Sequence, residues 1–170
     1  MRHDFLKKQQ EIFKFIGQGR CQHLYLDFGT NIGVQIRKLY EPFYFPDANV
    51  LQIFSEVFSN ADPKSICVVG FEPNKAMKDR LQELESSYRE VGFPCTIFTE
   101  VAVYGEDKVL TFYRDNTAAP ENHEWGSSLV KWKKNMTSSS YDVLAIHTCN
   151  FVHSLLHKQV AHRELQRGAE

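Results

Sequence analysis

Apolar residues recur at helical spacing in some stretches of the chain and form short continuous runs in others, a pattern typical of alternating helices and buried strands. From Asp4 to Ile16 the spacing predicts a surface helix that ends near Gly17 and packs against the edge of a sheet. The run from His23 to Phe28 predicts the first core strand, which leads into a tight turn. One apolar face from Asn31 to Tyr40 predicts the helix that follows.

The alternation of strands and helices continues after an inserted segment. Residues 41–59 form this insertion, which begins with prolines and aromatic residues and resumes a helical pattern from Ala48 to Phe58. Ser65 to Phe71 predicts a second buried strand. Asn74 is placed to cap an amphipathic helix that runs to about Glu90.

The last part of the chain adds strands of a different kind. Cys95 to Val103 predicts a third strand, which turns at Gly105 into the alternating run Lys108 to Arg114 and forms an antiparallel hairpin. A polar loop follows from Asp115 to Ser128, and residues 141–158 fit either a last strand and helix or one helix. Together these elements predict an α/β fold with a doubly wound, mostly parallel sheet.

Length and charge narrow the class of protein. A chain of 170 residues fits one domain, and its 13 Phe and 7 Tyr exclude a disordered protein. We expect residues 1–20 to form an N-terminal helix, residues 21–130 a cofactor-binding core and residues 131–170 a C-terminal segment. The formal charge of -1 provides no overall field for nucleic acid or anionic lipid, so neither is an expected partner.

Cysteine usage and the N-terminus bear on location. The four cysteines, Cys21, Cys67, Cys95 and Cys149, lie far apart and include no Cys-x-x-Cys pair, so we expect reduced, packed thiols. The N-terminus begins with basic residues but has no uninterrupted apolar segment, and no later stretch approaches about 18 apolar residues. These features predict a soluble, cytoplasmic protein that does not span a membrane.

The turn from Asp27 to Gly33, between the first strand and its helix, carries the strongest functional signal. Ligands of parallel α/β sheets bind outside the carboxyl ends of the strands, where this turn lies. Gly29 permits a close approach that a Cβ would obstruct, and Gly33 allows the helix to pack tightly. Asn31 is placed to cap that helix, whose N-terminus faces the ligand. The candidate ligand-binding residues here are Asp27, Gly29, Thr30, Asn31 and Gly33.

Two carboxylates flank this turn and indicate the kind of ligand. The dinucleotide pattern Gly-x-Gly-x-x-Gly places glycines where a pyrophosphate meets a helix N-terminus. Asp27 replaces the first of these glycines, which suits a ligand with an ammonium group and no phosphate, such as the methionine end of S-adenosylmethionine. Glu72 ends the second strand, where a carboxylate accepts hydrogen bonds from both hydroxyls of a ribose. Pro73 helps to end that strand.

Successive motifs over residues 25–129 resemble those of the FkbM-type methyltransferases. They are residues 24–33, residues 70–74, residues 100–105 with residues 110–113, and Gly126-Ser127-Ser128-Leu129. The resemblance implies a Rossmann-like class I methyltransferase fold that binds S-adenosylmethionine. It also implies O-methylation of a hydroxyl on a small molecule or glycan, and it adds Ala102 and Val103 as residues that line the adenine pocket. No catalytic base is identified.

The C-terminus departs from the family pattern. Members continue with a Leu-Asp-Asp-like segment, whereas His147 stands here where an acid is expected, and a later strand with Lys-x-Asp-x-Glu-Gly is absent. We therefore expect a truncated form whose sheet is incomplete and has an exposed edge. This expectation supports a second hypothesis, a non-catalytic chain that binds a partner chain or a second copy through that edge.

Three weaker patterns support other interpretations. A nicotinamide-dependent oxidoreductase would use the same turn for a dinucleotide. His153 and His157 share one helix face, but no glutamate is placed as in His-Glu-x-x-His, so we expect solvated residues and no metal site. A basic and aromatic cluster, which we interpret as a solvated loop rather than a nucleic-acid site, comprises Trp125, Lys131, Trp132, Lys133 and Lys134.

Overall fold

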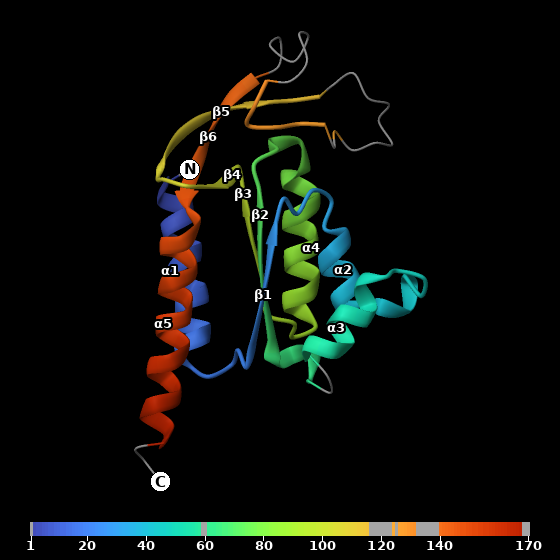
Figure 1. Ribbon diagram of the computed structural model, residues 1–170, viewed down its shortest axis with the longest axis vertical. Helices are drawn as coiled ribbons and strands as arrows, with labels where there is room; N and C mark the ends of the chain where they lie inside the picture. The colour runs from blue at the N-terminus through green and yellow to red at the C-terminus, as the bar shows by residue number, and fades with distance from the viewer. Residues whose placement is uncertain (1, 59–60, 116–123, 125, 132–139, 168–170) are drawn as a thin grey trace.

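Continuous apolar runs form strands and amphipathic stretches form helices in the computed structural model, which describes residues 2–58, 61–115, 124, 126–131 and 140–167 (Figure 1). The helices are α1 (Arg2–Gly17), α2 (Val34–Tyr40), α3 (Val50–Phe58), α4 (Lys78–Glu90) and α5 (Thr148–Arg167). The strands are β1 (His23–Phe28), β2 (Ile66–Glu72), β3 (Cys95–Thr99), β4 (Val101–Tyr104), β5 (Lys108–Tyr113) and β6 (Ser140–His147). Short 3-10 helices lie at Pro42–Tyr44, Pro63–Ser65 and Lys75–Met77.

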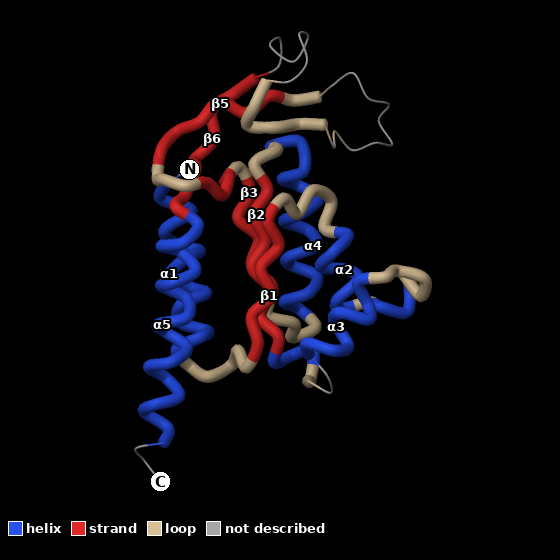
Figure 2. The backbone as a smooth tube through the Cα atoms, viewed as in Figure 1, coloured by secondary structure: helices blue, strands red, loops and turns tan. Residues whose placement is uncertain are grey.

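The first sheet is parallel and has the order β1-β2-β3. Asp27 of β1 lies opposite Gly70 of β2, and Val68 of β2 lies opposite Cys95 of β3. Every residue of the central strand β2 is buried, as its unbroken apolar run predicts. Helices α1 and α5 lie on one side of this sheet and α2, α3 and α4 on the other (Figure 2). The predicted α/β organisation with a parallel sheet is therefore confirmed.

The second sheet is mixed and corrects two predictions. Its order is β4-β6-β5, with β4 parallel to β6 and β5 antiparallel to β6. The predicted strand Cys95 to Val103 is two strands, because Glu100 adopts a φ of 60° that bends the chain between them. Strand β5 pairs antiparallel to a neighbour, as predicted for Lys108 to Arg114, but that neighbour is β6, so the predicted hairpin with the preceding strand is wrong. Residues 140–167 are thus a strand and a helix, one of the two alternatives for this segment.

Two local features differ from the predicted boundaries. The helix expected from Asn31 begins only at Val34, because Asn31 and Gly33 have φ angles of 49° and 82° that no α-helix accepts. Asn74 caps the 3-10 helix that precedes α4, through a 3.0 Å hydrogen bond from the backbone N–H of Ala76 to its Oδ1. Residues 30–33 are therefore free to form the turn above the sheet.

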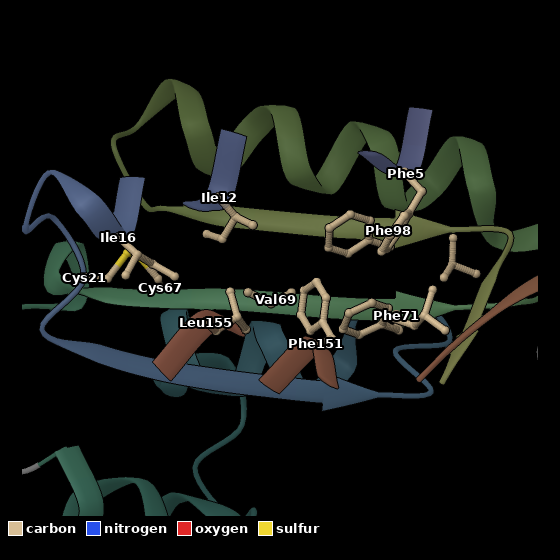
Figure 3. Packing of buried hydrophobic residues seen from close by; sticks show 12 residues of the cluster. Phe5, Ile12, Ile16, Cys21, Cys67, Val69, Phe71, Phe98, Phe151 and Leu155 are labelled. Carbon is tan, nitrogen blue, oxygen red and sulfur yellow. A yellow bond between two sulfur atoms is a disulfide. The ribbon is translucent and has the colours of Figure 1, made fainter. Parts of the chain in front are cut away.

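The largest core cluster joins α1 and α5 to one face of the first sheet (Figure 3). Phe71 of β2 stacks on Phe98 of β3 at 4.9 Å and meets Phe151 of α5 edge-on at 5.1 Å. Phe5 and Ile12 bring α1 onto the same cluster. Helix α1 therefore packs against the edge strand β3, as predicted, and its apolar residues also cover the buried face of the sheet.

The two edges of the first sheet differ in the side-chain hydrogen bonds that their backbone forms. On the outer edge of β3, Lys8 Nζ donates to the carbonyl of Ile97 at 2.7 Å. The N–H of Ile97 donates to the carboxylate of Glu85 at 3.2 Å. Arg89 Nε donates to the carbonyl of Cys95 at 2.7 Å. Within the described residues, no side chain forms such a bond to the backbone of residues 23–26 of β1. The β1 edge therefore remains available for a further strand.

Cys21 and Cys67 form a disulfide, which corrects the prediction that all four cysteines are reduced (Figure 3). The spacing of 46 residues gave no signal, because the two are brought together only by the packing of the segment before β1 against β2. Disulfides persist in oxidising compartments, so this bond is at odds with a cytoplasmic location. None of the described helices is long and apolar enough to span a membrane.

The turn after β1 yields a stability prediction. Gly33→Ala puts a Cβ in van der Waals conflict with Leu84 Cδ2 of α4 and forces an L-residue to a φ of 82°. We expect the free energy of unfolding, measured with urea, to fall by about 1–3 kcal/mol. Gly105→Ala is the matched control, because its Cβ meets nothing within 4 Å, and it should change stability by less than about 0.5 kcal/mol. Equal effects of the two substitutions would contradict the tight packing of the turn.

Candidate functional site

A cavity of about 360 Å³ lies at the carboxyl ends of β1 and β2, where the glycine turn was predicted to bind a ligand. Its size falls within the range of small-molecule sites. The turn, the start of α2, the end of β2 and the segment after β5 all contribute walls. The lining residues are Gly29, Thr30, Asn31, Ile32, Val34, Gln35, Lys38, Glu72, Pro73, Asn74, Phe112, Glu124 and Ser127.

The turn is held above the end of β2 by its own backbone. The N–H groups of Gly29 and Thr30 both donate to the carbonyl of Phe71 at 3.0 Å. Thr30 Oγ1 donates to the carbonyl of Asp27 at 3.2 Å and lies where a Cβ on Gly70 would approach it to 2.6 Å. Gly29 has a φ of 86°, it lines the cavity, and a Cβ there would meet nothing within 4 Å. Glycine is therefore required here for its conformation, and it leaves bare main chain toward a ligand.

Asp27 lies under this turn with its carboxylate buried. Its side chain is 8% exposed, and among the described residues its Oδ2 atom has no hydrogen-bond partner. Burial raises the pKa of Asp27 to about 6, against the opposing effect of a hydrogen bond from Thr30. Asp27 does not itself line the cavity, but it directly precedes the lining residues of the turn. A buried carboxylate oxygen without a hydrogen-bond partner is complemented by a ligand group that is cationic or donates a hydrogen bond.

Glu72 is the second buried carboxylate and lies on the same face of the sheet as Asp27. Asp27 is opposite Gly70, and Glu72 follows two residues later, so both side chains point toward α2. The N–H groups of Asn31 and Asn74 donate to its two oxygens at 2.5 and 2.7 Å. Burial raises the pKa of Glu72, these two N–H groups lower it, and the charge of Asp27 raises it further. The two predicted carboxylates are thus brought together.

The opposite wall of the cavity contains residues that the sequence did not single out. Arg114 and Glu124 form an ion pair through both guanidinium Nε and Nη2, and this pairing lowers the pKa of Glu124. Asn74 Nδ2 also donates to Glu124, at 3.0 Å. Ser127 of this wall lies in the serine-containing motif that resembles the methyltransferase family, which is the one signal that pointed to this segment. No sequence motif pointed to Arg114 or Glu124 as residues of a site.

The predicted cofactor-binding residues divide into two groups. Gly29, Thr30, Asn31, Glu72 and Pro73 line the cavity, and Asp27 and Gly33 support the turn from below. Ala102 and Val103, expected at the adenine pocket, belong to β4 and do not line the cavity. Ala102 is instead buried against Phe112, so it supports this wall from behind.

The structure describes the histidine pair more fully than the basic and aromatic cluster. The described residues include no group of three or more His, Cys, Asp or Glu side chains placed to hold a metal ion. The rings of His153 and His157 lie 6.3 Å apart on α5, as their spacing predicts. Most of the basic and aromatic cluster lies outside the described residues, namely Trp125, Trp132, Lys133 and Lys134.

Charge at the cavity favours a cationic ligand. Its lining includes one basic side chain, Lys38, and two carboxylates, Glu72 and Glu124, and Asp27 lies directly beneath the turn. Arg114 neutralises Glu124 through their ion pair, so the negative charge here comes from Glu72 and Asp27. A pyrophosphate carries two negative charges and is not complemented by this balance.

No known protein family, curated protein or solved structure matches the chain, so the site itself is the basis for a functional argument.

The buried carboxylate of Asp27 yields a prediction about pH. Its folded-state pKa of about 6 exceeds the unfolded value of about 3.9, so the protonated form favours folding and stability falls as pH rises through this window. Asp27→Asn removes the ionisation and should raise the free energy of unfolding by up to about 3 kcal/mol at pH 7. Near pH 4 the gain should shrink below about 1 kcal/mol.

Urea unfolding at both pH values measures this gain. Asp47→Asn is the matched control, because Asp47 is exposed, and it should change stability little at either pH. A destabilised Asp27→Asn protein at pH 7 would show that the carboxylate has a partner in the folded chain.

Proposed function

We propose that the chain binds S-adenosylmethionine at this cavity and acts as a methyltransferase on a hydroxyl of a small molecule or glycan. The observation that carries the proposal is the buried carboxylate of Asp27, with one oxygen unpartnered among the described residues, beneath a glycine turn. S-adenosylmethionine carries an ammonium, a sulfonium and one carboxylate group and no phosphate, so its net positive charge complements an acidic site. The resemblance of the sequence motifs to the FkbM-type methyltransferases supports the same ligand.

Each part of the cavity suits a part of this ligand. The carboxylate of Asp27, which lies beneath the turn and outside the cavity lining, complements the ammonium group in charge. Glu72 uses one acceptor position on each oxygen for a backbone N–H, and a carboxylate has about four such positions, so two remain for ribose hydroxyls. Ile32, Pro73 and Phe112 offer apolar surface to a purine ring. The residues present therefore fit the nucleoside and the amino acid of the ligand.

Methyl transfer depends mainly on the alignment of the acceptor oxygen with the methyl group. The bound sulfonium supplies an electrophilic methyl group, and rate is gained by holding an acceptor oxygen in line with it and excluding water. The hydrogen-bonded turn and the side chain of Glu124, which Arg114 holds by an ion pair, provide surfaces for this purpose. A dinucleotide-dependent oxidoreductase is a poorer fit, because its pyrophosphate would lie close to the carboxylates of Glu72 and Asp27.

A second candidate function is supported by the sheet edges. Side chains of Lys8, Glu85 and Arg89 bond to the outer backbone of β3, whereas among the described residues no side chain bonds to the backbone of residues 23–26 of β1. Proteins that avoid edge pairing usually protect both edges. An uncovered parallel edge favours a non-catalytic chain that adds a strand from a partner or from a second copy.

Calorimetry separates these functions. We expect S-adenosylmethionine and S-adenosylhomocysteine to bind and NAD not to bind. Binding of NAD alone would contradict the methyltransferase proposal. Binding of none of the three, together with a dimer in analytical ultracentrifugation, would favour the second function.

A substitution tests the role of Asp27 in binding. Asp27→Asn should weaken S-adenosylmethionine roughly ten- to hundredfold, because a charge-assisted contact to the ammonium group is lost. The same substitution should leave the affinity for methylthioadenosine, which lacks that group, within about twofold. Asp47→Asn is the control and should alter neither affinity. Equal losses for both ligands would mean that Asp27 does not meet the amino-acid end.

A further inference from the structure

The hydroxyl of Tyr141, on β6 of the second sheet, reaches across to the end of β2. It accepts a 2.7 Å hydrogen bond from the N–H of Lys75 and lies 3.2 Å from Asn74 Oδ1 and 3.3 Å from the carbonyl of Pro73. The ammonium of Lys75 lies 4.3 Å from the centre of the Tyr141 ring. The second sheet is therefore fastened to the segment that follows Glu72.

Asn74 is the point on which these contacts converge. It is 2% exposed, and its side chain is held on three sides: Oδ1 accepts from the N–H of Ala76 and faces the Tyr141 hydroxyl, and Nδ2 donates to Glu124. Arg114 fixes Glu124 in turn. The Asn74 side chain cannot rotate without breaking these part-buried hydrogen bonds.

The backbone of Asn74 transmits this restraint to the candidate ligand site. Its N–H donates to Glu72 Oε1 at 2.7 Å, while the N–H of Asn31 donates to Glu72 Oε2 at 2.5 Å. These two bonds set the plane of the carboxylate and hence the direction of its remaining acceptor positions. Tyr141 does not line the cavity, so any effect it has on a ligand passes through Asn74 and Glu72.

We propose that Tyr141 is a positioning residue that aims the Glu72 carboxylate at the ribose hydroxyls of the bound nucleoside. This inference rests on the proposed function, since it concerns the same cavity. It makes β6 part of the nucleoside site, although that strand lies in the other sheet. Burial raises the pKa of Tyr141 to about 12, so its hydroxyl keeps its proton at neutral pH and serves as a fixed hydrogen-bonding group.

Tyr141→Phe removes the hydroxyl and keeps the ring. The N–H of Lys75 is exposed and regains water, so the folded state should lose little stability. The affinity for methylthioadenosine, which contains the ribose and adenine but no amino acid, should fall about five- to tenfold in calorimetry. Tyr113→Phe is the matched control, because Tyr113 lies in the same sheet and does not line the cavity.

A double-mutant cycle with Glu72→Gln distinguishes positioning from a general structural role. If Tyr141 acts through Glu72, the loss caused by Tyr141→Phe should shrink to less than twofold in the Glu72→Gln background. The 2′,3′-dideoxy analogue of methylthioadenosine should bind equally well to the wild type and to Tyr141→Phe. It lacks the ribose hydroxyls that would donate hydrogen bonds to Glu72.

The outcomes are separable. Wild-type binding that Tyr141→Phe leaves unchanged overturns the positioning role and leaves the proposed function standing. Additive losses in the cycle, or an equal loss for the dideoxy analogue, likewise overturn it. No binding of methylthioadenosine by the wild type overturns the proposed function and this inference together.

Discussion

Two carboxylates buried side by side under one turn are the constraint on which the rest of the site depends. Taking a carboxylate out of water is costly unless hydrogen bonds or a cation compensate. Glu72 receives two backbone N–H groups, whereas one oxygen of Asp27 receives nothing from the described residues. Such a buried, incompletely satisfied charge is a feature of functional sites rather than of stable cores.

The fold holds these charges in place through both of its sheets. Parallel pairing of β1 and β2 puts Asp27 and Glu72 on one face at the carboxyl ends of the strands. The second sheet then closes the cavity from the other side, with Phe112 of β5 as a lining residue and Tyr141 of β6 behind the loop after β2. The cavity thus lies where the two sheets meet, and neither sheet alone would form it.

The sequence predicted local features better than features of assembly. The strands β1 and β2, the turn and the two carboxylates follow from apolar runs, glycines and residue chemistry, which act over a few neighbouring positions. The Cys21–Cys67 disulfide, the insertion of β6 between β4 and β5, and the contact of Tyr141 with Asn74 join residues 27 or more positions apart. Nothing in local spacing encodes such pairings. Ala102 and Val103 show the same limit, because the bend at Glu100 moves β4 into the other sheet.

Compensation of the Asp27 charge by a cationic ligand would change the pKa of this residue. A carboxyl-carbon NMR titration of protein labelled at aspartate would give the value with and without S-adenosylmethionine. We expect a pKa of about 6 in the free protein and a value below the usual 3.9 or so in the complex, because a nearby ammonium group stabilises the carboxylate. A pKa that stays at about 6, or rises, when the ligand is bound would contradict it.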